Sequence, residues 1–529
     1  MNDVLFRDGE TPFFPLGLQC CNSSAFNASE MKAFWDSVAF TGVNTVEIPV
    51  YWETFEPEQN LFCYEFVDEC LRQADLYDVK VIFLWFGSWK NGTSKYAPTW
   101  IKENPGKYKR VVTYEGIVTN ILSPYCRENL EADKAAFLKL VQYIEQNNRK
   151  KNRVIGIQIE NEPGMMMRGD RDCGPIAETL FQEEVPDEVK SVVFHHELGE
   201  VTDIWKEKGA LTDGCWTDLF GEKAGEYFSV FGIASYIQEL AAEAKKITDL
   251  TMIVNVWTDN VGWDEPGVDY PAGGPVSKVL GLWKMFAPDV DVVGLDNYKL
   301  DREGYLQDCQ RYSKYGNPLF LPESHAWDEA NSQTMFWAVG RYKAKGLFLF
   351  GPEAMYSDTG EIKPCSAEII KSIKALVSIQ SVLPHFINSG GIWAVVQEDK
   401  MTEQKICQGD AYIRIFFEFE RTDYHHGYFG TKHGKGRGLL LRENANTYYA
   451  VGEGINISIR QNSGILYSRQ RMDKYIGYKK VEEGYFDKQG RWICTRRRNG
   501  DESDYGIWVT SDVGAVKIEL EEVKHCGEI

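Results

Sequence analysis

Short apolar runs alternate with amphipathic segments along residues 1–381. Runs rich in β-branched residues predict strands at 15–20, 44–50, 79–85, 154–159, 250–257, 290–298, 318–323 and 346–350. Between them, apolar positions spaced three and four apart predict helices, as at 29–41, 67–77, 132–147 and 230–247. Strands that alternate with helices are typical of a parallel sheet. Eight such units predict an α/β fold, a (β/α)8 TIM barrel.

A doubly wound sheet is the alternative fold. It would more often have a glycine-rich turn after the first strand, and "QCCNSSAF" (19–26) is not one. Within the barrel pattern, residues 164–226 contain Gly, Asp and Pro throughout, and we expect an irregular insertion there. This segment follows the carboxyl end of the fourth strand, where long loops usually serve function.

After residue 382 the pattern changes to an alternation of apolar and polar residues with turn signals between the runs, as in "AYIRIFFEFER" (411–421) and "GAVKIELEEV" (514–523). Period-two alternation in short segments indicates half-buried strands. The sequence therefore predicts two domains, a barrel over 1–381 and an all-β domain over 382–529.

The chain carries a formal net charge of -20, which argues against a nucleic acid partner because phosphate backbones require a basic surface. The first residues, "MNDVLFRDGE", lack the basic and apolar regions of a signal peptide, and no apolar run is long enough to span a membrane. We therefore expect a cytoplasmic protein whose 12 cysteines are free thiols. A homo-oligomer is compatible with this sequence.

The stretch "VIGIQIENEPG" (154–164) begins as an apolar strand and ends in carboxylates and an amide. The strand at 318–323 also ends in a glutamate, Glu323. In a TIM barrel the active site lies at the carboxyl ends of the strands, so Glu162 and Glu323 are expected to converge. Cleavage of a glycoside needs such a pair, one a protonated acid and the other an ionised nucleophile held about 5–5.5 Å away in retaining enzymes.

"ENEPG" (160–164) resembles the fourth-strand signature of the clan A glycoside hydrolases. This resemblance implies that Glu162 is the acid/base and that Asn161 binds the sugar 2-hydroxyl. It also implies that Glu323 is the nucleophile and that Tyr298, after the sixth strand, hydrogen-bonds it. The stretch "GVNTVEIPVYWETFEPEQNLFCYE" (42–65) is similar to the family 35 β-galactosidases, in particular to a subset with an uncharacterised C-terminal β domain.

The sequence departs from the family 35 pattern at positions where that family binds the sugar. Pro49 aligns with a sugar-binding tyrosine of the family, and Lys90-Asn91-Gly92 replaces a Cys-Ala-Glu segment that binds galactose hydroxyls. We therefore expect Lys90 and Asn91 to supply replacement hydrogen bonds to the substrate.

Tryptophans near the strand ends are further candidates for contact with a sugar ring. Trp89 follows a glycine in a polar segment, which favours a sugar-stacking platform. Trp85 and Trp257 lie at the ends of the third and fifth strands, where sugar contact and packing in the barrel are both consistent with the pattern.

Other polar residues have weaker signals. His325 follows Glu323 by two positions and is a candidate partner of the catalytic residues, and Glu53 and Glu353 are candidate substrate contacts. His195-His196-Glu197 lacks the HExxH spacing of a zinc site, so we expect no metal there and no metal or organic cofactor elsewhere.

These residues and the resemblance together predict a retaining exo-β-glycosidase, β-galactosidase-like, that acts on an oligosaccharide or small glycoside. A β-glucosidase or a transglycosylase would use the same two glutamates. The alternative from another class is a carbohydrate-binding protein without catalysis.

Overall fold

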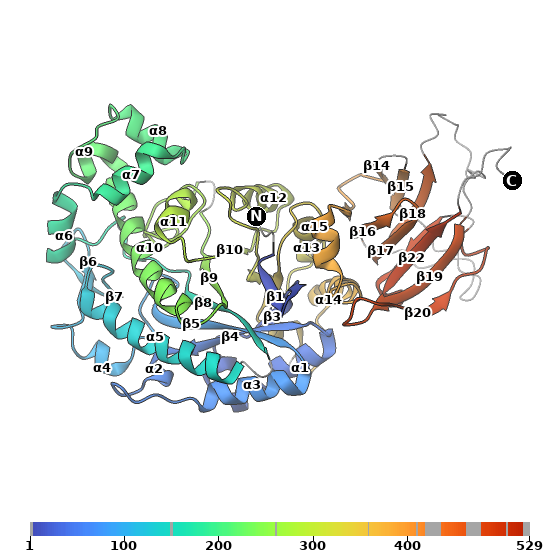
Figure 1. Cartoon of the computed structure of the whole chain (residues 1–529), viewed down its shortest axis with the longest axis horizontal. Coiled ribbons are helices and arrows are strands. Elements are labelled where there is room, and N and C mark those ends of the chain that lie inside the picture. The colour runs from blue at the N-terminus through green and yellow to red at the C-terminus, as the bar shows by residue number, and fades with distance from the viewer. Residues whose placement is uncertain are drawn as a thin grey trace.

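The computed structural model describes residues 4–148, 152–259, 262–357, 359–408, 411–417, 435–461, 478–503 and 506–521. Figure 1 shows two parts side by side, a helix-covered barrel and an orange-to-red pair of sheets that carries the C-terminal part of the chain. In the part that the structure describes, no helix combines the length and apolar character needed to cross a bilayer.

Eight parallel strands form the barrel, which confirms the predicted fold. The strands run in the order β11 (Glu323–Ser324), β10 (Val292–Asn297), β9 (Thr251–Val256), β8 (Val154–Asn161), β5 (Lys80–Lys90), β4 (Thr45–Tyr51), β3 (Leu16–Gln19) and β12 (Leu347–Phe350). Parallel bridges from Leu321 to Leu347 and from His325 to Phe350 join the two ends of this sheet. β11 is shorter than the predicted strand at 318–323, whereas β5 continues five residues beyond the prediction at 79–85.

Helices cover the outside of the barrel, as the 3.6-residue pattern predicts. They are α1 (Lys32–Thr41), α3 (Glu65–Tyr77), α5 (Arg127–Asn148), α10 (Ala224–Lys245), α11 (Leu280–Phe286), α12 (Arg302–Arg311), α13 (Asn331–Gly340) and α14 (Pro364–Val377). Local sequence fixes several of their ends. α1 stops at Gly42 in the left-handed conformation (φ 75°), and Asp301 caps α12 by accepting the Gly304 amide.

Small elements fill the connections. They are the hairpins β1–β2 (Phe6–Asp8 and Thr11–Phe13) and β6–β7 (Arg110–Val112 and Val118–Leu122), the short helices α2 (Trp52–Phe55) and α4 (Thr99–Lys102), and the 3₁₀ turns η1 (Ser24–Phe26), η2 (Ala28–Met31), η3 (Gly221–Lys223) and η4 (Pro352–Met355).

The expectation of an irregular insertion at 164–226 is wrong for about half of this segment, which folds into four short helices. They are α6 (Pro175–Gln182), α7 (Asp187–His195), α8 (Glu200–Glu207) and α9 (Trp216–Phe220), and they stack beside α10 at one end of the barrel (Figure 1). The helix-breaking residues mark helix ends. Pro175 occupies the first turn of α6, Pro186 precedes α7, and Gly199 precedes α8.

After α15 (Leu383–Ser389) the chain forms two antiparallel sheets, as the alternating pattern predicts. The first sheet runs β13 (Ile392–Val396), β16 (Arg437–Asn444), β17 (Thr447–Glu453), β22 (Ala515–Leu520), β19 (Tyr478–Phe486) and β20 (Trp492–Arg497). The second runs β14 (Glu403–Gln408), β15 (Ala411–Phe417), β18 (Ile455–Gln461) and β21 (Ile507–Val509), and η5 (Ser511–Val513) precedes β22.

The inner strands β16 and β17 of the six-stranded sheet are largely buried on both faces. Leu439 and Leu441 of β16 belong to the hydrophobic core of the barrel, whereas Leu440 between them belongs to a second core against the four-stranded sheet. Arg437, also on β16, is 1% exposed and donates hydrogen bonds to Glu368 and Ser372 of α14. The β part is therefore packed onto the barrel helices through a shared core.

Candidate active site

Glu162 directly follows β8, and the backbone around it leaves the regular strand conformation. Glu160 and Glu162 both have left-handed backbones, with φ of 61° and 46°, a conformation that costs energy in residues with side chains and often marks functional sites. Two contacts hold the turn, because Asn255 Oδ1 accepts the Glu162 amide at 2.7 Å and the Gly92 amide donates to the Glu162 carbonyl at 3.2 Å. The Glu162 side chain is thereby fixed at the mouth of the barrel.

Glu323 lies at the first position of β11 and is 6% exposed. Its two carboxyl oxygens each accept one hydrogen bond. Gln19 Nε2 donates to Oε1 at 2.8 Å, and the Tyr298 hydroxyl donates to Oε2 at 2.7 Å. Donors on both oxygens stabilise the ionised form, which is the form that a nucleophile needs.

Glu162, Asp296 and Glu323 each contribute a carboxyl oxygen, and these oxygens lie within 4.8 Å of one another. Burial, and after it the charge of Glu323, raise the pKa of Glu162 to about 7, against an opposing effect of Lys90. The two glutamates therefore have different environments, one suited to hold a proton and the other suited to remain charged.

Carboxyl oxygens at this spacing also occur around divalent cations. Here Gln19, Tyr298 and Asn255 already direct N–H and O–H donors at Glu323 and Asp296. Each donor satisfies one carboxyl oxygen without a cation, and the arrangement is compatible with an acid/base cluster.

The sequence reasoning missed four polar residues that point into the barrel: Gln19 on β3, Glu47 on β4, Asn255 on β9 and Asp296 on β10. All four are at most 2% exposed. Glu47 stands out because neither of its carboxyl oxygens has a hydrogen-bond partner, and burial, then the charge of Glu323, raise its pKa. The sequence did contain a signal for these four residues. Each is a charged or amide residue inside an otherwise apolar strand, where a polar side chain is costly to bury.

Asn161, Lys90 and Asn91 come together beside Glu162. The Asn91 amide donates to the Asn161 carbonyl at 2.9 Å, and the side chain of Asn161 approaches those of Asn91 and Asn255. Lys90 extends over the ring of Phe86, with Nζ 5.4 Å from its centroid, and its charge acts on Glu162. Lys90 and Asn91 keep some exposed surface there, whereas Asn161 is fully buried.

Two tryptophan predictions need correction, because Trp89 and Trp85 are both fully buried. The Trp89 indole donates to the Leu122 carbonyl and packs edge-on against Tyr236, while the Trp85 indole donates to Asp133. Rings without exposed faces cannot stack on a sugar.

Glu160 explains why the segment with these tryptophans turns inward. Its carboxyl group accepts the amides of Ser88 at 3.0 Å and Trp89 at 2.7 Å, which fastens the end of β5 to β8. Burial, and then Asp133, raise the pKa of this carboxyl group. Glu160 thus supports the site without facing the other two glutamates.

Trp257 follows β9 and is partly buried against the main core, so it retains some exposed surface near the barrel mouth. His325 Nε2 donates a hydrogen bond to the Tyr298 carbonyl at 3.1 Å, and the ring lies edge-on to both Tyr298 and Trp327. His325 therefore contacts both Tyr298, which hydrogen-bonds Glu323, and Trp327.

A hollow of about 580 Å³, lined in part by Trp327, lies at the carboxyl ends of β3 and β12. Its lining is mostly apolar and consists of Cys21, Ser24, Trp327, Phe350, Gly351, Glu353, Ala354, Lys363 and Cys365. Glu353 accepts the Cys21 amide at 3.3 Å through Oε1, while its buried Oε2 has no partner. The sequence reasoning identified Glu353 and missed Trp327 and Phe350.

Glu53, His195 and Glu197 lie outside the carboxyl cluster. Glu53 on α2 forms an ion pair with Lys102 at 3.1 Å. His195 ends α7, and neither it nor Glu197, which pairs with Lys206, belongs to a metal-like cluster among the described residues.

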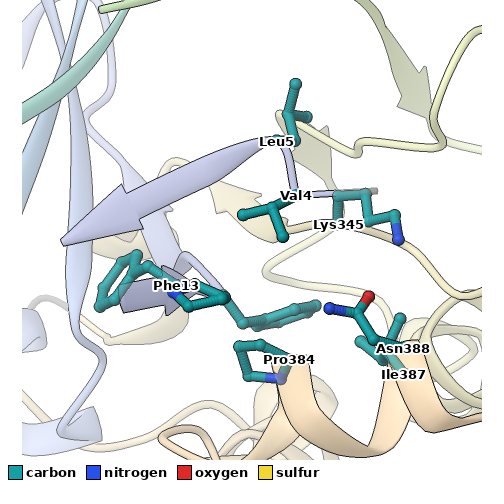
Figure 2. A pocket seen from close by; sticks show the side chains of 9 residues that line it. Val4, Leu5, Phe13, Lys345, Pro384, Ile387 and Asn388 are labelled. Carbon is teal, nitrogen blue, oxygen red and sulfur yellow. The ribbon is translucent and has the colours of Figure 1, made fainter. Parts of the chain in front are cut away.

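A second hollow of about 20 Å³, the volume of one water, lies at the opposite end of the barrel strands (Figure 2). The residues that line it include Val4, Leu5, Phe13, Lys345, Pro384, Ile387 and Asn388.

Comparison with known proteins gives one family match and several structural similarities. Residues 371–510 match a domain of unknown function, DUF5597, a range that begins inside α14 and ends just after β21. No curated protein matches the sequence.

The solved structures similar to this chain include three glycoside hydrolases. The catalytic domain of a β-amylase from Paenibacillus polymyxa is 11% identical, with a TM-score of 0.49 over 68% of this chain and 97% of that one. A β-galactosidase from Bacillus circulans sp. alkalophilus is 13% identical, with a TM-score of 0.48 over 70% of this chain and 56% of that one. An exo-β-1,4-mannosidase from Opitutaceae bacterium strain TAV5 is 14% identical, with a TM-score of 0.42 over 71% and 62%.

Proposed function

We propose that this chain is a retaining exo-β-glycosidase that cleaves a terminal β-linked sugar by double displacement. The observation that carries the proposal is the pair Glu162 and Glu323, whose carboxyl oxygens lie within 4.8 Å in contrasting environments. A close carboxyl pair is compatible with the retaining arrangement, in which one carboxylate attacks the anomeric carbon directly.

In the proposed reaction, Glu323 attacks the anomeric carbon while Glu162 protonates the departing oxygen. Water then attacks the glycosyl-enzyme with Glu162 as the base, which releases the sugar with its original configuration. The hydrogen bonds from Gln19 and Tyr298 support the charged state of Glu323 before attack. The pKa of about 7 lets Glu162 serve as acid and as base near neutral pH.

The sugar is proposed from the resemblance to family 35 to be galactose or a close relative. Asn161, Lys90, Asn91 and Trp257 are the side chains proposed to contact it. A β-glucoside is the second candidate, because Pro49 and Lys90 stand where family 35 has sugar-reading residues. Transfer to a second sugar is the third, and the aromatic hollow with Trp327 supports it as an acceptor site.

The division of the chain into residues 1–381 and 382–529 is likewise proposed. The second part would act as a brace for the barrel helices, because the two share one hydrophobic core.

Hydrolysis of nitrophenyl glycosides tests the reaction. The panel contains β-galactoside, β-glucoside, β-xyloside, β-fucoside and α-arabinoside, and Glu323→Gln is the inactive control. Turnover of one β-linked sugar that is lost in the variant supports the proposal and names the sugar. Turnover that survives in Glu323→Gln refutes it. A protein that binds these sugars without turnover on the panel or on natural oligosaccharides is the carbohydrate-binding alternative.

A further inference from the structure

Asp296 is a buried carboxyl group that the two-glutamate reaction does not use. It is 2% exposed and pairs in register with Glu323 of the neighbouring strand. Asn255 Nδ2 donates to its Oδ2 at 2.8 Å, whereas its buried Oδ1 has no donor. A buried oxygen with no donor is costly for a carboxylate, but it is the place where a carboxylic acid would carry its proton.

The position of Glu162 supplies an acceptor for that proton. A carboxyl oxygen of Asp296 lies within 4.8 Å of a carboxyl oxygen of Glu162, and the two residues are 2% and 7% exposed. Two ionised carboxylates repel each other in such a buried site, and a proton on Asp296 removes that repulsion.

The surrounding charges favour a proton at this contact. Glu47 on β4 and Glu323 on β11 add negative charge around Asp296, while Lys90 on β5 acts on Glu162. Tyr298 and Tyr312 also lie near Asp296, and burial keeps both hydroxyls neutral by raising their pKa. Ionisation of all four buried carboxyl groups would be costly, and Glu323 is the one that holds two donors.

We propose that Asp296 is a positioning residue that remains protonated and donates a hydrogen bond from Oδ1 to the carboxyl group of Glu162. This inference rests on the proposed role of Glu162 as acid/base. After Glu162 gives its proton to the departing oxygen, the hydrogen bond from Asp296 stabilises the carboxylate that remains. Asp296 keeps its proton throughout, so the proton balance of the reaction is unchanged.

A pair of variants tests the hydrogen bond through activity. Asparagine can imitate a protonated aspartate, because its oxygen accepts from Asn255 and its amide donates to Glu162. We expect Asp296→Asn to keep most of kcat/KM with the alkaline limb of its pH profile unmoved. Asp296→Ala should lose roughly 10- to 100-fold, the effect of a lost hydrogen bond to a charged group.

The opposite protonation state gives a different result. If Asp296 were ionised, Asp296→Asn would remove a negative charge next to Glu162 and lower the pKa of that residue. The alkaline limb of the variant would then move to lower pH by about one unit or more, which would overturn the proposal.

Thermal unfolding tests the protonation of Asp296 without a substrate. A carboxyl group that is protonated in the fold and ionised in the unfolded chain costs stability as pH rises above its unfolded pKa. The Tm of Asp296→Asn minus that of the wild type should therefore increase from about pH 4 to about pH 8. Asp36→Asn, which removes one charge from the exposed pair with Lys32, is the control and should show no such increase.

The activity assay and the thermal unfolding series separate the proposed glycosidase function from the proposed protonation of Asp296. A wild type that cleaves no glycoside refutes the proposed function, while the rise in the Tm difference still reports a protonated Asp296. Activity with a flat or falling Tm difference refutes the inference about Asp296 and leaves the glycosidase proposal standing.

Discussion

Replacement of Glu323 by glutamine should lower the pKa of Glu162. The two carboxyl groups approach within 4.8 Å, and the charge of Glu323 is the second-largest cause, after burial, of the raised pKa of Glu162. The substitution removes the charge with little change in shape and burial, so the variant separates the two causes.

The structure sets the size of this effect. The rise from 4.5 to about 7 corresponds to about 3 kcal/mol, and burial accounts for the largest share. Lys90 opposes both causes, so the net rise does not by itself give the share of the charge. Two unit charges at this distance interact by about 3.5 kcal/mol at an effective dielectric constant of about 20, which is enough to contribute a large part of the rise. We expect the Glu162 pKa in the variant to fall below its wild-type value of about 7.

Carbon-13 NMR of protein labelled at the glutamate carboxyl carbon can follow this titration, with Glu162→Gln to identify the resonance. The surface variant Glu53→Gln removes a glutamate that pairs with Lys102 outside the cluster, and the Glu162 titration should be unaffected by it. An unchanged pKa in Glu323→Gln would mean that burial alone raises it. A rise would contradict the proposed charge on Glu323.

Glu162→Ala should lose roughly 10²- to 10⁴-fold in turnover, and azide should restore activity on substrates with good leaving groups because it replaces the missing base. Tyr298→Phe should lower kcat/KM roughly 10- to 150-fold, because Glu323 loses a donor that is 2.7 Å from Oε2. Arg437→Met should lower the free energy of unfolding by about 2 to 4 kcal/mol with kcat unchanged, because it breaks the buried contacts between β16 and Glu368 of α14. Kinetics and thermal unfolding measure these effects.

Two of these variants have a matched control. Tyr485→Phe removes a hydroxyl from a tyrosine that is 44% exposed, and it should change neither activity nor stability. Arg491→Met removes an exposed arginine that pairs with Asp487, and it should cost less than about 1 kcal/mol. A Tyr298→Phe enzyme with wild-type kcat/KM would contradict the role of that hydroxyl. An Arg437→Met protein as stable as the wild type would contradict the shared core as a brace.

The sequence alone determined the barrel and the pair of glutamates at its mouth, because both depend on local patterns. Buried parallel strands must be apolar runs, and helices between them must have one apolar face, so both are visible in a single stretch of chain. Glu162 and Glu323 could be predicted for the same reason, since each directly follows an apolar run and strand ends in a barrel meet at one face.

Tertiary structure decided which of the other polar and aromatic residues belong to the site. Trp89 is buried because Glu160, from another strand, fixes the end of β5, and no local pattern contains that contact. Asp296 and Glu47 lie near the glutamates because closure of the barrel brings inward-facing positions of distant strands together. The alternation within one strand shows that a residue points inward, whereas the identity of its neighbours depends on the register of every strand around the barrel.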